Sequence, residues 1–205
     1  ERAREAMLNS ANVSVDEVSS TEKNINKIDV KIDGKCENIL ALYNPVAVDL
    51  RFVMACLSYN TFLERVGDNA KAIVKIAEEI DGQFTEEQLT TWGLLEMFDT
   101  SLIMLESVKE GIDSDDTKVV GATFKLDAQL DELEKLAQQS LMDFAEQNTD
   151  KIRATFMLYP VFRKMERVGD LITNISEELI FYIDAKVLKH KKTKKKVKYI
   201  EESND

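Results

Sequence analysis

Two helical segments of this chain each carry a pair of carboxylates that flank a glycine. The pentapeptide ERVGD occurs at residues 64–68 and again 102 positions later, at 166–170. It pairs Glu64 with Asp68 and Glu166 with Asp170. Like charges four residues apart share one helix face and destabilise it by about 0.2–0.5 kcal/mol. A glycine inside a helix costs about 1 kcal/mol relative to alanine. Because both segments carry both penalties, we infer that a neighbouring helix or a bound cation approaches closely there.

Further acidic side chains lie on segments that match each other at a displacement of 105 positions. The acids of the second half and their counterparts in the first half are Asp127, Asp131 and Glu134, and Glu22, Asn26 and Asp29. Helices that present carboxylates to each other form an all-oxygen cation site. The sequence therefore predicts such a site in each half, for a divalent or trivalent metal ion such as Mg, Mn, Fe or Zn. The alternative is a solvated acidic face crossed by ion pairs.

Most histidine-dependent chemistry is disfavoured, because the single histidine, His190, lies among lysines near the C-terminus. Di-iron carboxylate proteins of the helical-bundle type use Glu-x-x-His pairs, and catalytic triads and most catalytic zinc sites also need histidine. The sequence also has no glycine-rich phosphate loop and no nucleophile elbow. We therefore expect a binding protein without catalytic residues. A metal-dependent hydrolase is kept as an alternative, and turnover in a phosphatase assay would favour it.

The elements that position these acids are predicted to be long helices. The chain has only 7 Gly and 2 Pro in 205 residues, too few for the turns of an all-β fold. A fragment at 1–9 reads as an incomplete first helix, and Pro45 is predicted to be the first residue of the third. A capping box of Thr85 and Gln88 should open a fourth helix that closes at Gly111, and a fifth should start at 113–116.

These signals, with the internal repeat, predict an all-α protein of two tandem three-helix bundles related by duplication. The first bundle spans residues 1–82, the second 83–189, and a basic, disordered tail covers 190–205.

The formal net charge is −11 although eight lysines lie within 186–198, so the remainder is strongly acidic and nucleic acid is not an expected partner. The sequence contains no apolar run long enough for a transmembrane helix. Cys36 and Cys56 have no metal-ligand spacing and are interpreted as small core residues in a reducing, cytoplasmic protein.

The doubled ERVGD segment resembles the signature of the PhoU family. Residues 45–51, PVAVDLR, are similar to that family's Pro-x-Ala-x-Asp-Leu-Arg segment, and Asn174-Ile175 with IFY at 180–182 resembles its closing segment. The resemblance covers about residues 15–185. It implies a cytoplasmic, non-enzymatic homodimer that represses the phosphate-starvation response. Its implied partners are the ATPase of the phosphate ABC transporter and a sensor histidine kinase.

The family's acidic motifs can hold metal clusters, and they correspond here to Glu64 with Asp68, Glu166 with Asp170, Asp127 with Asp131, and Glu22 with Asn26. Asn26 is an amide where many members of the family have an acid, and Ala72 stands where an asparagine is common, as Asn174 is in the second half. Both departures affect the first-half site.

The repeat also pairs Arg51 with Arg153. These arginines are either contacts for a partner or i, i+4 pairing residues. The resemblance leaves open a second function, as the cytoplasmic regulatory domain of a sodium–phosphate cotransporter.

Overall fold

In a computed structural model, which describes residues 1–188, all regular elements of the described chain are helices, so the all-α prediction is confirmed. Their bounds are α1 Arg2–Leu8, η1 Ser10–Asn12, α2 Val15–Tyr43, α3 Ala47–Glu79, α4 Glu86–Thr91, α5 Leu94–Ser114, η2 Val119–Ala122, α6 Thr123–Gln147, η3 Thr149–Lys151 and α7 Ile152–Asp184. The basic tail expected at 190–205, together with Lys189, lies outside the described residues. None of the helices within 1–188 is long and apolar enough to cross a membrane.

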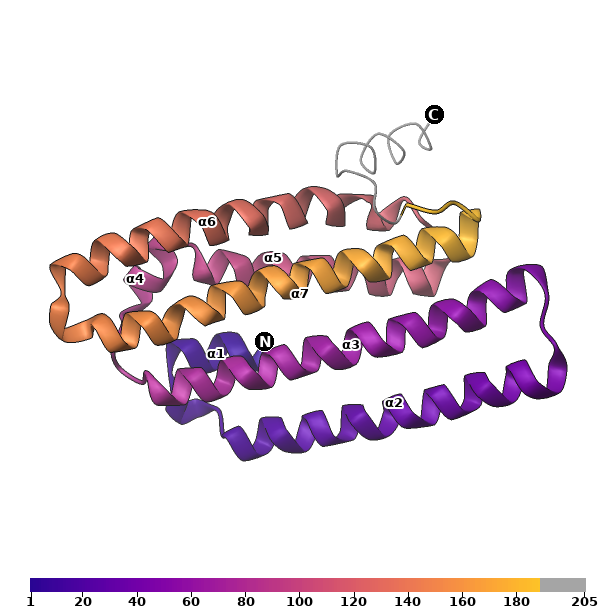
Figure 1. The fold of residues 1–205 in the computed structure, drawn as a ribbon, viewed down its shortest axis with the longest axis horizontal. Helices are drawn as coiled ribbons and strands as arrows, with labels where there is room; N and C mark the ends of the chain where they lie inside the picture. The colour runs from indigo at the N-terminus through magenta and orange to yellow at the C-terminus, as the bar shows by residue number, and fades with distance from the viewer. Residues whose placement is uncertain (189–205) are drawn as a thin grey trace.

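The helices α3 and α7 run antiparallel through the middle of the molecule and hold the two halves together (Figure 1). The helix α2 packs on α3, whereas α6 and α5 pack on α7. The α2–α3 loop and the α6–α7 turn lie at opposite ends (Figure 1). Side chains of both halves, such as Ile73, Leu130, Phe162 and Ile175, belong to one continuous apolar core. Burial along the central pair therefore sets how α2 faces α3 and how α6 faces α7, and with them the acids that each pair of helices carries.

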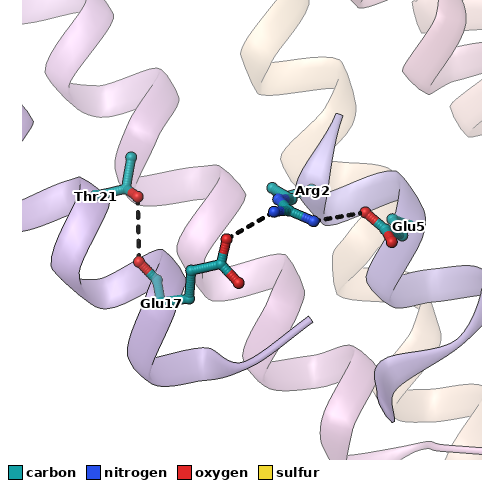
Figure 2. A network of polar contacts seen from close by, with 4 residues as sticks. All are labelled: Arg2, Glu5, Glu17 and Thr21. Carbon is teal, nitrogen blue, oxygen red and sulfur yellow. Dashed lines mark hydrogen bonds and ion pairs between the residues drawn. The ribbon is translucent and has the colours of Figure 1, made fainter. Parts of the chain in front are cut away.

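The helix α1 is short; it packs on α3 through the buried Ala3, Ala6 and Met7, and exposed ion pairs add to this contact. Arg2 binds Glu5 of its own helix at 3.0 Å and Glu17 of α2 at 2.8 Å (Figure 2). Arg4 binds Asp99 of α5 at 2.8 Å. With 7 residues against the 21 of α5, α1 covers only the C-terminal half of α3, near Val66 and Ile80.

The opposite end of the α2–α3 hairpin exposes an unusual number of apolar side chains. This apolar tip consists of Ile39, Leu42, Tyr43, Val46, Val48, Leu50, Phe52 and Met54. The hairpin also extends past the ends of the neighbouring helices at this end of the molecule (Figure 1). The first half therefore has its apolar surface uncovered where α1 does not reach.

The α2–α3 loop differs from the prediction by two residues. Asn44 ends α2 with a left-handed backbone (φ 45°, ψ 55°), and α3 begins at Ala47 instead of Pro45. Asparagine tolerates the left-handed region better than most residues, which explains why the turn forms there. Pro45 consequently lies in the loop.

The predicted fourth helix is two helices in the structure. The capping box of Thr85 and Gln88 is present, but α4 ends at Thr91 and α5 begins after Gly93, which has a left-handed φ of 81°. The prediction that Gly111 closes this helix is wrong, because α5 continues to Ser114. A Cβ at Gly111 would lie 2.8 Å from both Leu179 and Val120, so this glycine permits close packing inside a helix. The fifth predicted helix is α6, which begins at Thr123 after the short turn η2 and not at 113–116 as predicted.

Candidate functional site

Five acids of the second half gather where α6 faces α7. Asp127, Asp131 and Glu134 lie on α6, and Glu166 and Asp170 lie on α7. Burial, followed by the charge of Asp170, raises the pKa of Asp131. The same two causes, in the same order, raise the pKa of Glu166, to which Asp131 and Glu134 also contribute. Carboxylates that raise one another's pKa in this way are close together and repel. We call these five side chains the second-half acidic face.

Gly169 lets the two helices of this face come together. A Cβ placed on Gly169 would lie 2.5 Å from Leu130 Cδ1 and 2.9 Å from Asp127 Oδ1. Both distances are shorter than a normal van der Waals contact, and Leu130 is completely buried. The glycine between Glu166 and Asp170 therefore permits close approach of α6, including the carboxylate of Asp127.

Glu134 is buried and is held by α7. The hydroxyl of Tyr159 donates a hydrogen bond to Glu134 Oε1 at 2.7 Å, and Arg163 Nη1 lies 3.7 Å from the same oxygen. This hydrogen bond is the main cause of the raised pKa of Tyr159. Neither Tyr159 nor Arg163 was identified from the sequence. The repeat could not have indicated them, because their counterparts 102 positions earlier are Leu57 and Thr61.

The first half arranges the matching positions differently. Glu22 of α2 accepts a hydrogen bond from Lys71 Nζ at 2.7 Å and another from Asn26 Nδ2 at 2.8 Å. Lys71, and then Asn26, lower the pKa of Glu22. Burial, then Asp68 and Asp29, raise the pKa of Glu64. A Cβ on Gly67 would lie 3.2 Å from Ile25, so the approach of α2 is less close than at Gly169.

Lys71 was also missed in the sequence, although a signal was present. It lies three residues after Asp68, one turn further along the acidic stripe of α3, and its counterpart in the second half is Thr173. A cation in one copy of a repeat and a neutral residue in the other indicates a different charge balance. The structure shows that this lysine occupies the acidic face of the first half.

The two halves differ in how well their acids fit the metal ions expected from the sequence. Within residues 1–188, no three acidic, cysteine or histidine side chains lie together in an arrangement that could hold an ion. In the first half, the ammonium group of Lys71 already compensates Glu22, so the set fits a metal poorly. The second-half acidic face contributes only carboxylate oxygens, the donor type that hard cations prefer. Its chemistry fits, and its side chains would have to turn toward a common point.

Arg51 and Arg153, which the repeat pairs, have different surroundings. Arg51 Nε donates to the backbone carbonyl of Tyr182 at 3.0 Å, and the ring of the adjacent Phe52 lies 5.3 Å from that of Tyr182. Arg51 therefore joins the start of α3 to the end of α7. Arg153 is exposed beside a shallow hollow that Gln83 and Asp150 also line.

These helices and acidic faces define a class of proteins: all-α, built from two matched halves that each place carboxylates between facing helices. The PhoU domain matches residues 1–77 and 94–179, so this chain belongs to the PhoU family. The resemblance seen in the motifs is thereby confirmed.

Relatives and solved structures agree with this membership. The "phosphate-specific transport system accessory protein PhoU homolog" of Deinococcus radiodurans is 27% identical over 88% of this chain and 84% of that protein. The corresponding accessory protein PhoU of Escherichia coli K12 is 28% identical over 82% of this chain and 69% of its own. The crystal structure of PhoU from Pseudomonas aeruginosa has a TM-score of 0.84 at 22% identity, covering 90% of this chain and 88% of that one, and supports the fold. The relatives are named as accessory proteins, which agrees with the expectation of a non-enzymatic protein.

Proposed function

We propose that this chain regulates phosphate uptake as an accessory protein of a phosphate transport system. When phosphate is plentiful, it represses the phosphate-starvation response by binding the ATPase of the phosphate ABC transporter and a sensor histidine kinase, on the cytoplasmic side of the membrane and as a homodimer. The observation that carries the proposal is the PhoU domain, which matches most of the chain in two segments. Relatives named as phosphate-specific transport system accessory proteins support it.

The proposal includes a metal ion, divalent or trivalent, at the second-half acidic face. Asp127, Asp131, Glu166 and Asp170 would hold it, and the ion would offset the repulsion that raises the pKa of Asp131 and Glu166. The close approach at Gly169 brings the α6 and α7 donors together. An ion that binds only the folded form would stabilise this face. The face would then serve as a rigid platform to which the partners bind.

A deletion strain tests the regulatory function. Without this gene, phosphate-transporter genes should be expressed even in high phosphate, and a plasmid copy should restore repression. Unchanged expression in the deletion strain would contradict the proposal. Complementation with Asp131→Asn combined with Asp170→Asn tests whether the acidic face is needed. Glu146→Gln, an exposed acid near the end of the same helix α6, is the matched control and should restore repression fully.

A separate measurement tests the metal. Protein purified without chelator should contain a metal by elemental analysis, and its melting temperature should rise with Mg²⁺, Mn²⁺, Fe or Zn²⁺. Asp170→Asn should lower both the metal content and this rise. Equal melting temperatures with and without each metal would refute the metal site while leaving the regulatory proposal standing.

A further inference from the structure

Contacts between α2 and α3 fix how the two helices run past each other. The ion pair of Glu22 with Lys71 lies at one end of their interface, and further along Ile25 lies opposite Gly67. Next, Asn60 Nδ2 donates to Asp33 Oδ1 at 2.9 Å. Each step forward along α2 is matched by an almost equal step back along α3, as in any antiparallel pair of helices.

The same register continues one helical turn beyond the Asn60–Asp33 hydrogen bond. Three residues after Asp33 is Cys36, and four residues before Asn60 is Cys56. Residues three and four apart lie on one face of a helix, so both cysteines belong to the facing sides of α2 and α3. The two thiols therefore lie across the interface from each other.

The surroundings of the two thiols agree with this placement. Both are free; Cys36 is 5% exposed, and Cys56 is half-buried. Burial, followed by the effect of Cys36, raises the pKa of Cys56. Burial is also the main cause of the raised pKa of Cys36. In the second half, the corresponding positions on α6 and α7 are Leu141 and Leu158, and both are buried in the core.

We propose that Cys36 and Cys56 form a thiol-oxidation site that closes into an intramolecular disulfide when a two-electron oxidant such as hydrogen peroxide reaches it. The more exposed Cys56 first loses its proton, a step that its raised pKa makes slow at neutral pH, and then attacks one peroxide oxygen as the thiolate. The O–O bond breaks, the leaving hydroxide takes up that proton, and the products are a sulfenic acid on Cys56 and one water. Cys36 then gives up its proton and attacks the Cys56 sulfur as the thiolate; the S–O bond breaks, and the leaving hydroxide takes up that proton as the second water. The two thiols lose two protons and two electrons in total, and the peroxide takes up both to become two waters.

The position of this site gives it a structural consequence. All eight side chains of the apolar tip lie between Cys36 and Cys56 in the sequence. A disulfide would therefore tie α2 to α3 at the base of the tip and restrict its opening. The second half has no equivalent, because two leucines occupy the corresponding positions.

The experiment oxidises the full chain with hydrogen peroxide and identifies the disulfide by mass spectrometry without reduction. Trypsin cuts after Lys35, Arg51 and Arg65, so the expected product joins peptides 36–51 and 52–65, with a mass lower by two hydrogens. The melting temperature should rise by roughly 6–12 °C, because the bond constrains the unfolded chain. Dithiothreitol should reverse both changes.

Cys36→Ser and Cys56→Ser are the matched controls, and each should abolish the joined peptide. Comparing oxidised with reduced parent protein needs no variant, so a variant that fails to fold does not affect the result. The proposal is overturned if both thiols still react with maleimide after oxidation. It is equally overturned if oxidation yields only a disulfide between two copies or a sulfinic acid on Cys56 while Cys36 stays reduced.

Discussion

The two halves of this molecule share a fold but balance their charges in different ways. In the first half, Lys71 and Asn26 contact Glu22, and their hydrogen bonds lower its pKa. Burial and neighbouring acids raise the pKa of the first acid of the motif in both halves, Glu64 and Glu166, but only the second half adds a further acid of raised pKa, Asp131, on the facing helix. Duplication therefore kept the helices and the ERVGD motif while the chemistry between the helices diverged. A shared motif is a guide to the fold of each half, and the residues around it decide what each acidic face can bind.

The halves also differ in how closely their helices pack. Leu130 is completely buried against Gly169, whereas its counterpart Ile25 is only partly buried beside Gly67. The long helix α5 covers α6 and α7, and the short helix α1 leaves the apolar tip uncovered. The second half should therefore respond more strongly to changes in volume at matched positions.

The largest expected difference comes from truncating these two apolar side chains. Leu130→Ala should lower the free energy of unfolding by about 2–5 kcal/mol, because it leaves a cavity in a closely packed site. Ile25→Ala should cost clearly less, since part of the side chain is already in water. Urea unfolding of both variants gives the comparison. Equal losses would show that the two interfaces are packed alike.

The glycines give the next largest effect. Gly169→Ala should destabilise by about 1–3 kcal/mol, since the added methyl group would overlap Leu130 and Asp127. Gly67→Ala should cost less or even stabilise, because Ile25 can move toward solvent and alanine favours the helix by about 1 kcal/mol. Urea unfolding with and without metal is the measurement.

A double variant sharpens the glycine test. Combining Gly169→Ala with Leu130→Ala removes the overlapping side chain. The double variant should therefore lose less unfolding free energy than the two single variants lose together. Strict additivity would argue that the methyl group is not excluded by Leu130. A Gly169→Ala variant more stable than the parent would contradict close approach altogether.

Much of this fold could be predicted from the sequence because its signals are local or repeated. The scarcity of glycine and proline indicated long helices, and the 102-residue repeat indicated two matched halves. The predicted start of a helix at Pro45 was two residues early, because the turn that begins at the left-handed Asn44 includes Pro45. The predicted end of a helix at Gly111 was wrong for a different physical reason. A glycine that permits close packing, as at Gly111, looks the same in sequence as one that ends a helix.

The acidic site could be predicted only in part. The repeat identified the carboxylates, because their spacing places them on one helix face. Their partners come from other elements and differ between the halves: Lys71 in the first, and Tyr159 with Arg163 in the second. No local pattern reports which side chain a neighbouring helix brings, so the charge balance of each face emerged only with the packing of α2 on α3 and of α6 on α7.

The paired arginines should show a smaller difference. Arg51→Ala removes the hydrogen bond to the Tyr182 carbonyl between α3 and α7, and we expect a loss of about 0.5–1.5 kcal/mol. Arg153→Ala, at an exposed position, should change stability by less than about 0.5 kcal/mol. Thermal unfolding of the two variants is sufficient to compare them. If Arg153→Ala leaves stability intact but impairs repression in the complementation assay, Arg153 is a partner contact.

The smallest expected effects have opposite signs in the two halves and depend on pH. Asp131 has a raised pKa in the folded state, so its contribution to stability is present below its unfolded pKa of about 3.9 and is lost as pH rises through the folded value. Asp131→Asn should therefore be more stable than the parent at pH 7, by about 0.2–0.5 kcal/mol as for other like-charge pairs, with no advantage below about pH 4.

Glu22 has a lowered pKa, so its contribution to stability is present above its unfolded pKa of about 4.3 and is lost as pH falls. Glu22→Gln should be less stable than the parent at pH 7, and the difference should shrink in acid. Urea unfolding from pH 3 to pH 8, in chelator and at low salt, measures both, since a bound cation would cancel the repulsion at Asp131. Changes of the same sign at pH 7 would mean that the two faces do not differ in charge balance.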